Sequence, residues 1–183
     1  NREWGEADGS DRFFEQVHSY GIPLFTLSSQ RFRREHGGGS FSDHRLLYDR
    51  AVMKLLEDYD PDLCVLAGYM LIADVELCKR FTMLNLPPAL PGGPVGTWRD
   101  VIWKVIEEKS DQSGAYIHVV TEDLDRGPIL TYCSFPIRGK PFDDLWEQVE
   151  GRSIDHLKAS EGEKLPLFQH IRQRGVTLEP ILL

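Results

Sequence analysis

The chain has 183 residues, 41% of them hydrophobic, and its 29 acidic and 21 basic side chains give a net charge of -8. One core of ordinary size fits this length, so we expect a single domain over residues 1–183. The negative charge disfavours nucleic acid as a partner, because binding to phosphates needs a basic surface. No apolar run reaches the roughly 18 residues of a membrane span, so we expect a soluble protein with no membrane partner.

The cysteines exclude the common metal and disulfide frameworks. Cys64, Cys78 and Cys133 are odd in number and far apart, with no CxxC pair and no His at zinc-ligand spacing. We therefore expect no metal and a reducing, cytoplasmic location.

The first half of the chain alternates helical and apolar segments. Gly21 predicts the end of a helix over residues 10–20, residues 22–27 read as a strand, and the Arg- and Gly-rich residues 31–39 read as a loop. From Ser42 an apolar stripe with helical spacing predicts a long helix that ends before Pro61. Residues 62–68 form a short apolar run that is typical of a strand covered on both faces.

The second half continues this α/β pattern. Residues 73–81 predict a helix and residues 83–86 a strand, which breaks at Pro87. Thr97 has the position of an N-cap, with Asp100 three residues later, and opens a further helix. The remaining expected elements are strands at 114–121 and 129–137 and a helical region from Asp143 to Arg174.

Three polar residues stand where an α/β sheet usually places its site, at strand ends and in the loops that follow. Asn85 ends an apolar strand, and its amide could donate to an oxygen that becomes negative during acyl transfer; a turn-capping Asn is the alternative. His118 lies in an apolar strand, where a buried structural His is the simpler interpretation. Asp125 could orient a water or an imidazole, or it could serve only the turn before Gly127.

The glycine-rich loop before Thr97 could hold an anion through the backbone amides of Gly92 and Gly93. It matches neither G-x-G-x-x-G nor G-x-x-x-x-G-K-[ST], so a plain turn is the favoured interpretation. The same mismatch argues against a dinucleotide-binding oxidoreductase.

Taken together, residues 61–70, 84–91 and 114–128 resemble the folate-dependent formyltransferases, above all the branch that serves purine biosynthesis. The last segment is the most specific, because the strand His118, the acidic loop, Asp125 and the Gly-Pro pair all have the family's spacing. The resemblance implies an α/β, Rossmann-like fold with a mostly parallel twisted sheet flanked by helices. Because the family's first strand and Gly-rich phosphate loop have no counterpart before Asn1, we expect this domain to be N-terminally incomplete.

The same resemblance implies a reaction and its residues. The donor would be 10-formyltetrahydrofolate and the acceptor an amine, most simply that of glycinamide ribonucleotide. Asn85 would stabilise the oxyanion, Asp125 would organise proton transfer through water, and His118 would support the same pocket. Glu161 would contact the ribose of the acceptor. The pterin would be held largely through backbone groups of Met70, Leu71, Ile72, Val120, Thr121, Glu122 and Asp123.

One departure from the family bears directly on catalysis. Pro87 stands where the family has His, and a pyrrolidine ring can neither donate a hydrogen bond nor carry a proton. The alternatives therefore include a catalytically silent folate-binding homologue, transfer to another acceptor and hydrolysis of the formyl donor. We expect small-molecule substrates in each case, and a homodimer is an open possibility.

Overall fold

The computed structural model describes residues 1–124 and 126–183, which divide into two compact units. The first unit comprises residues 1–64, 69–83 and 120–124, and the second comprises residues 65–68, 84–119 and 125–183. Helices of the first unit are α1 (Asp8–Ser19), α2 (Ser29–Glu35), the 3-10 helix η1 (Phe41–His44), α3 (Arg45–Leu55) and α4 (Val75–Arg80). Helices of the second unit are α5 (Trp98–Glu107), α6 (Phe142–Glu147), α7 (Ile154–Ser160), the 3-10 helix η2 (Gly162–Lys164) and α8 (Pro166–Leu182).

A four-stranded sheet has the order β1 (Cys64–Leu66), β2 (Met83–Asn85), β3 (Gln112–Val119), β4 (Ile129–Pro136). The α/β, Rossmann-like class expected from the sequence is confirmed. The sheet is mixed, however, where we expected mostly parallel strands: its pairs β2–β3 and β3–β4 are antiparallel. The reason is that the long connection over residues 86–111 reaches the far end of β3, so that β3 returns alongside β2 in the opposite direction.

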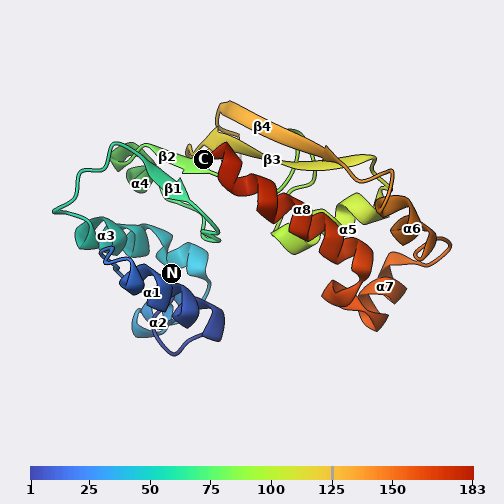
Figure 1. The fold of residues 1–183 in the computed structure, drawn as a ribbon. Coiled ribbons are helices and arrows are strands. Elements are labelled where there is room, and N and C mark those ends of the chain that lie inside the picture. The colour runs from blue at the N-terminus through green and yellow to red at the C-terminus, as the bar shows by residue number, and fades with distance from the viewer. Residues whose placement is uncertain (125) are drawn as a thin grey trace. The chain divides into compact units, whose positions relative to one another are not determined.

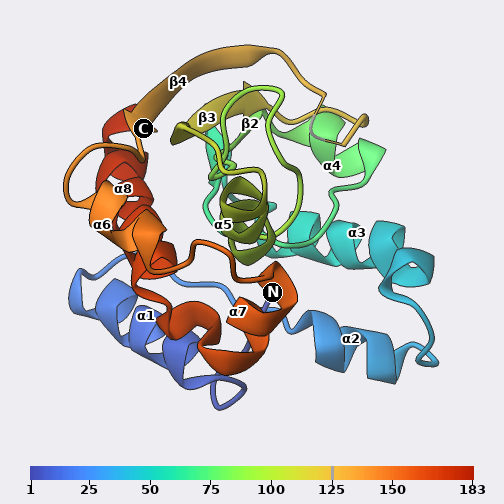
Figure 2. The ribbon, with the colours of Figure 1, turned by 90° about the vertical axis from the view of Figure 1, so that its right-hand side faces the viewer.

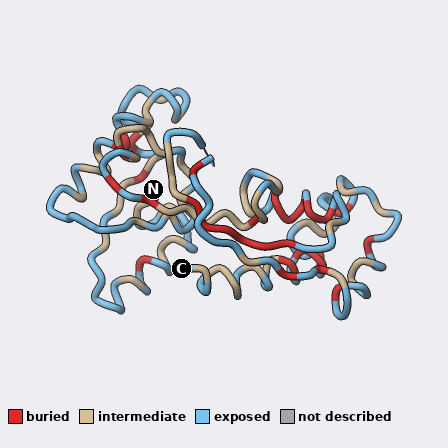
Figure 3. The backbone as a smooth tube through the Cα atoms, turned by 90° about the horizontal axis from the view of Figure 1, so that it is seen from above, coloured by how far each residue is buried: buried red, intermediate tan, exposed pale blue. Residues whose placement is uncertain are grey.

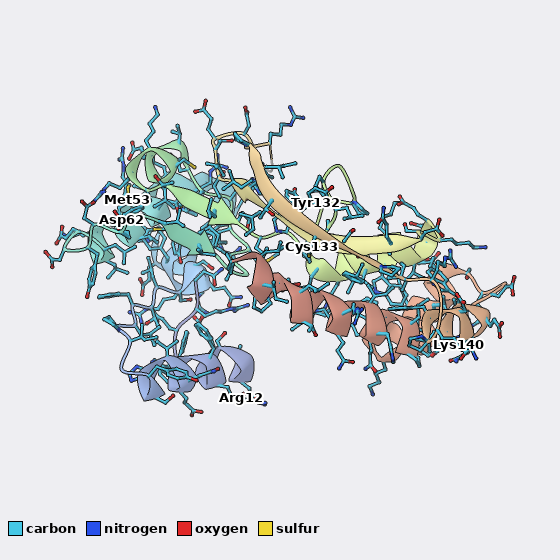
Figure 4. The ribbon with its side chains drawn as sticks, turned by 45° about the horizontal axis from the view of Figure 1, so that its top comes forward. Arg12, Met53, Asp62, Tyr132, Cys133 and Lys140 are labelled. Atoms are coloured by element: carbon cyan, nitrogen blue, oxygen red, sulfur yellow. The ribbon has the colours of Figure 1, made fainter. Side chains whose placement is uncertain are left out.

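The core of the second unit lies between the sheet and two helices. α8 packs against β3, β4 and α5 (Figure 1 and Figure 2). β3 is buried from Ser113 to His118, as the tube in Figure 3 shows. β4 has a solvent face, since Tyr132 is exposed while its neighbour Cys133 is half-buried (Figure 4). Each aliphatic side chain buried in this way contributes about 1.5–3 kcal/mol to stability.

Several predicted helix boundaries follow from local chemistry. Thr97 caps α5: its side chain accepts a hydrogen bond from Asp100 N, and the Asp100 carboxylate accepts one from Thr97 N in return. Gly21 has a φ of 65° just after α1, a conformation that favours glycine. Both boundaries confirm the sequence-based expectation.

Two expectations for the first unit are wrong. Residues 22–27 carry no strand, because this apolar run contains Pro23 and has no strand partner in the described chain. Residues 31–39, expected to be a loop, include most of α2, which Ser28 caps by accepting from Arg31 N. The buried Phe32 anchors that helix. None of the helices in the described ranges is both long and apolar enough to span a bilayer.

Candidate active site

Asn85 and His118 meet across two neighbouring strands of the second unit. Asn85 is the last residue of β2, and the antiparallel register places it directly opposite His118 on β3. Directly opposed residues project to the same face of a sheet, so the two side chains come together. The Asn85 Nδ2 atom lies 3.3 Å from His118 Nε2. The structure thus brings Asn85 and His118 together, and their catalytic role stays a prediction.

The hydrogen bonds of His118 define how it orients Asn85. His118 is 2% exposed, and its Nδ1 lies 3.0 Å from the carbonyl oxygen of Val119. A carbonyl oxygen only accepts, so Nδ1 carries the proton and donates it to Val119 O. With this proton on Nδ1, Nε2 can accept a hydrogen bond from the Asn85 amide. One Nδ2 hydrogen of Asn85 is directed at the imidazole in this way.

An irregularity in the sheet lies beside His118. Ile117 pairs with Thr131 while His118 pairs with Ile129, so Leu130 of β4 is an extra residue, forming a β-bulge. Bulges bend a strand and redirect a side chain, and they are frequent beside active sites. Tyr116, two residues before His118, packs on the imidazole with ring centroids 5.5 Å apart.

Position 87 lies next to this pair. The carbonyl oxygen of Pro87 accepts a hydrogen bond from Tyr116 N at 3.2 Å, so the antiparallel register continues two residues past β2. Because side chains alternate along an extended chain, residue 87 projects to the same face as Asn85. The proline ring therefore takes a place where a hydrogen-bonding side chain would face the site.

Asp125 lies outside the described residues, so its predicted role stays a prediction. The segment before it is described: Thr121 Oγ1 donates to Asp123 O at 3.1 Å, which makes a tight turn. Val120 N donates to Met83 O at 2.8 Å and so joins this segment to the start of β2 within the first unit.

The segments predicted to hold the pterin are short and accessible. Met70 and Ile72 are 60% and 44% exposed, and Leu71 between them is half-buried. Val120 and Thr121 are half-buried, while Glu122 and Asp123 are exposed. These accessible backbones fit recognition through main-chain groups, and their role as a pterin site stays a prediction.

The glycine loop is a turn whose amides are partly engaged. Gly93 N donates to Leu90 O at 2.8 Å across Pro91 and Gly92, and Gly92 has a φ of 74°. Proline followed by a glycine with positive φ is the arrangement of a type II turn. The Gly93 amide therefore has an internal acceptor, and anion binding by Gly92 and Gly93 stays a prediction that the structure does little to support.

Glu161 is the C-cap residue that follows α7, and it is held by an arginine. Its Oε1 lies 2.5 Å from Arg152 Nη2, and both side chains are about one-third exposed. This ion pair fixes the carboxylate at an accessible position, but no acceptor contact follows from it.

A pair of buried groups in the first unit gave little signal in the sequence. Asp49 of α3 is completely buried, although it sits in a helix between the stripe residue Tyr48 and the exposed Arg50. Tyr69 lies at the start of the segment that carries Met70 and Ile72, and its hydroxyl is also buried. No metal-binding cluster of His, Cys, Asp or Glu occurs in residues 1–124 and 126–183.

Comparisons with known proteins point to one family. The family model described as "Formyl transferase" matches residues 11–156. The chain is 35% identical to phosphoribosylglycinamide formyltransferase of Dictyostelium discoideum over 165 residues, which cover 82% of this chain and 76% of that protein. It is 29% identical over 152 residues to the enzyme of the same name from Escherichia coli (strain K12), covering 79% of this chain and 64% of the relative. The chain thus spans less than two thirds of that bacterial enzyme.

Solved structures share the fold at lower identity. The phosphoribosylglycinamide formyltransferase from Campylobacter jejuni matches with a TM-score of 0.57 and 22% identity, covering 80% of this chain and 70% of that one. Glycinamide ribonucleotide transformylase 1 from Symbiobacterium toebii matches with a TM-score of 0.58 and 22% identity, covering 97% of this chain and 70% of that one. Formyltetrahydrofolate deformylase from Burkholderia mallei matches with a TM-score of 0.53 and 20% identity, covering 90% of this chain and 52% of that one. The fold is therefore shared by proteins named for transfer and for hydrolysis.

Proposed function

The chain belongs to the formyl transferase family, and from this membership we propose that it transfers a formyl group from 10-formyltetrahydrofolate to an amine, in purine biosynthesis. The acceptor we propose is glycinamide ribonucleotide, the substrate implied by the names of the relatives. The observation that carries the proposal is the Asn85–His118 pair, which presents a held amide donor at the end of β2.

The proposed reaction needs a donor for a developing oxyanion. The acceptor amine attacks the formyl carbon, a C–N bond forms, and the carbonyl oxygen becomes negative in a tetrahedral intermediate. The second Nδ2 hydrogen of Asn85 would donate to that oxygen, while His118 keeps the amide from rotating. Collapse of the intermediate breaks the bond to the folate nitrogen, which takes up a proton as the amine loses one. We assign this proton transfer to water organised by Asp125.

The test is turnover with defined substrates. Purified protein is mixed with 10-formyltetrahydrofolate and glycinamide ribonucleotide, and the absorbance change from tetrahydrofolate formation is followed. Asn85→Ala should lower kcat by about 100- to 1000-fold, the usual cost of one oxyanion donor. Gln112→Ala, at the exposed start of β3, should leave kcat unchanged. Turnover that survives Asn85→Ala at the wild-type rate would contradict the proposed role.

A second candidate is a folate-binding homologue without turnover, and the observation that favours it is Pro87. Its ring occupies the face beside Asn85 without a donor or a titratable group. Tetrahydrofolate binding measured by calorimetry, together with no turnover on glycinamide ribonucleotide or other small amines, would select this candidate over the enzyme.

A further inference from the structure

Asp49 is a buried carboxylate whose place in the fold needs a reason. Among residues 1–124 and 126–183 it is the only Asp or Glu in the buried class, at 0% exposed. A buried carboxylate is costly unless hydrogen bonds compensate it, and an apolar residue would fill the same position in a helix at lower cost.

One contact is with the end of the exposed segment over residues 69–74. Asp49 Oδ2 accepts a hydrogen bond from Asp74 N at 2.5 Å. Asp74 in turn caps α4, since its Oδ1 accepts from Glu76 N at 3.1 Å. The C-terminal end of the segment is thus fixed to α3 and to the first turn of α4.

The second contact is with the start of the same segment. Burial raises the pKa of the Tyr69 hydroxyl, and the neighbouring Asp49 carboxylate raises it further. Tyr69 OH and Asp49 Oδ1 are both buried without another hydrogen-bond partner in the described chain. A hydrogen bond donated from the Tyr69 hydroxyl to Asp49 Oδ1 would satisfy both atoms. With that bond, one carboxylate would hold both ends of the segment, at Asp74 N and at the Tyr69 hydroxyl.

Between these two anchors the chain presents apolar side chains to solvent. Met70 is 60% exposed and Ile72 is 44% exposed, although both are large and hydrophobic. Holding a short exposed segment at both ends lowers the entropy that a ligand must remove when it binds there. The arrangement is that of a prepared contact for a flat, largely apolar ligand with main-chain hydrogen bonds.

We infer that Asp49 is the positioning residue for the formyl donor: through Asp74 N and the Tyr69 hydroxyl it holds residues 70–73 in the conformation that receives the pterin. This inference rests on the proposed function, because the ligand is the folate of that reaction. Asp49 itself touches no substrate. Its loss should lower the fraction of molecules with a competent segment, and the apparent affinity for the donor falls by the same factor.

The experiment separates donor affinity from catalysis and from general packing. The full chain is prepared as wild type, Asp49→Ala, Asp49→Asn and Tyr69→Phe. For each we measure Kd for tetrahydrofolate by calorimetry, KM for 10-formyltetrahydrofolate, KM for glycinamide ribonucleotide, and kcat. If the competent fraction falls to roughly a tenth, Asp49→Ala raises donor Kd and KM about tenfold and leaves the acceptor KM unchanged. Asp49→Asn should restore most of this affinity, because its amide can accept from Asp74 N and donate to the Tyr69 oxygen.

The matched control lies on the same two helices. Arg50 of α3 pairs with Glu76 of α4 at 2.6 Å on the exposed side. Glu76→Gln weakens the α3–α4 contact without touching the buried carboxylate, so donor Kd should stay at the wild-type value. An equal loss in Glu76→Gln would assign the effect to general packing and overturn the inference.

Further outcomes also decide the question. Wild-type donor affinity in a folded Asp49→Ala protein overturns the inference, as does an equal rise in the KM of donor and acceptor. If Asp49→Ala does not fold, Tyr69→Phe decides, since loss of one anchor should raise donor Kd by about two- to fivefold, and an unchanged Kd overturns the inference. If the wild-type chain binds no tetrahydrofolate, the proposed function fails, and the inference fails with it. If instead the wild-type chain binds tetrahydrofolate and the variants bind it equally well, the inference fails while the proposed function stands.

Discussion

The Asn85 amide nitrogen and the His118 imidazole face each other across β2 and β3, 3.3 Å apart and in direct register. They are far apart in the sequence, so only strand pairing brings them together. His118 is buried and donates to its own strand through Nδ1. The imidazole thus acts as a fixed acceptor that sets the direction of the amide.

If His118 acts through Asn85, the two residues should be coupled. His118→Phe removes the Nε2 acceptor at similar volume, and we expect kcat to fall by about 10- to 100-fold as the amide loses its orientation. In the Asn85→Ala background the same substitution should cost little more, because the amide it orients is already absent. Steady-state kinetics on both single variants and the double variant measure this coupling, with circular dichroism as the check of folding. Costs that simply multiply would mean that His118 acts independently.

Position 87 offers a gain of function. Pro87→His places a donor on the face that carries Asn85, and because Pro88 follows, the new residue keeps an extended backbone. If the site lacks only this hydrogen-bonding side chain, kcat should rise by about 100-fold, which is the usual effect of one donor to the transition state. The rate of tetrahydrofolate release measures it.

The matched control for this gain is Pro88→His. Pro88 lies at a bend that follows the extended chain, so a His at position 88 does not take the place beside Asn85 that residue 87 occupies. It should leave the rate unchanged. Equal increases of kcat for Pro87→His and Pro88→His would show that any nearby imidazole acts as a general buffer. No increase of kcat for Pro87→His would indicate a site that no longer uses a His at this position.

Local chemistry explains which features could be predicted. The Thr97–Asp100 capping box and the glycine after α1 are readable because the partners are three or fewer residues apart. The convergence of Asn85 and His118 followed from the family's spacing and strand alternation. The direction of β3 could not be predicted in this way. A helix between two strands suggests a parallel crossover, whereas the connection over residues 86–111 is long enough for β3 to return antiparallel to β2. Asp49 gave no signal, since its partners Asp74 and Tyr69 are distant in sequence.

Gly114 marks a close approach that only glycine permits. A Cβ at this position of β3 would lie 2.5 Å from Leu90 Cδ2 and inside contact distance of the Cys133 carbonyl oxygen. Because the carbonyl belongs to the paired strand β4, it cannot move away freely. We expect Gly114→Ala to lower the free energy of unfolding by about 1–3 kcal/mol, the typical cost of overpacking, as measured by urea denaturation.

Gly9 supplies the comparison for the same chemical change. It lies in α1 with no atom within 4 Å of an added Cβ and with an ordinary φ. Gly9→Ala should therefore stabilise the chain by about 0.5–1 kcal/mol through helix propensity. Similar effects of the two substitutions would contradict the close approach at Gly114.

Burial of Asp49 should make stability depend on pH. Burial is the main cause that raises the pKa of its carboxyl; the like charge of Asp74 adds to this, while the Asp74 N–H bond, Arg45 and Tyr69 oppose it. The folded chain therefore holds this proton at a higher pH than the unfolded chain does. The contribution of the group is fully present below the ordinary carboxyl pKa of about 3.9 and is lost as the pH rises through the folded value.

Asp49→Asn removes this titration while keeping the shape of the side chain and an acceptor for Asp74 N. Urea unfolding of both proteins between pH 4 and pH 7 should show the stability of the wild type falling relative to the variant as the pH rises, by about 1.4 kcal/mol for each pH unit by which the folded pKa exceeds the unfolded one. Asp74 and Arg45 are present in both proteins, so their titration largely cancels in the difference. Parallel stability profiles would mean that the carboxylate is compensated as a charged group, with Asp74 N and Tyr69 outweighing its burial.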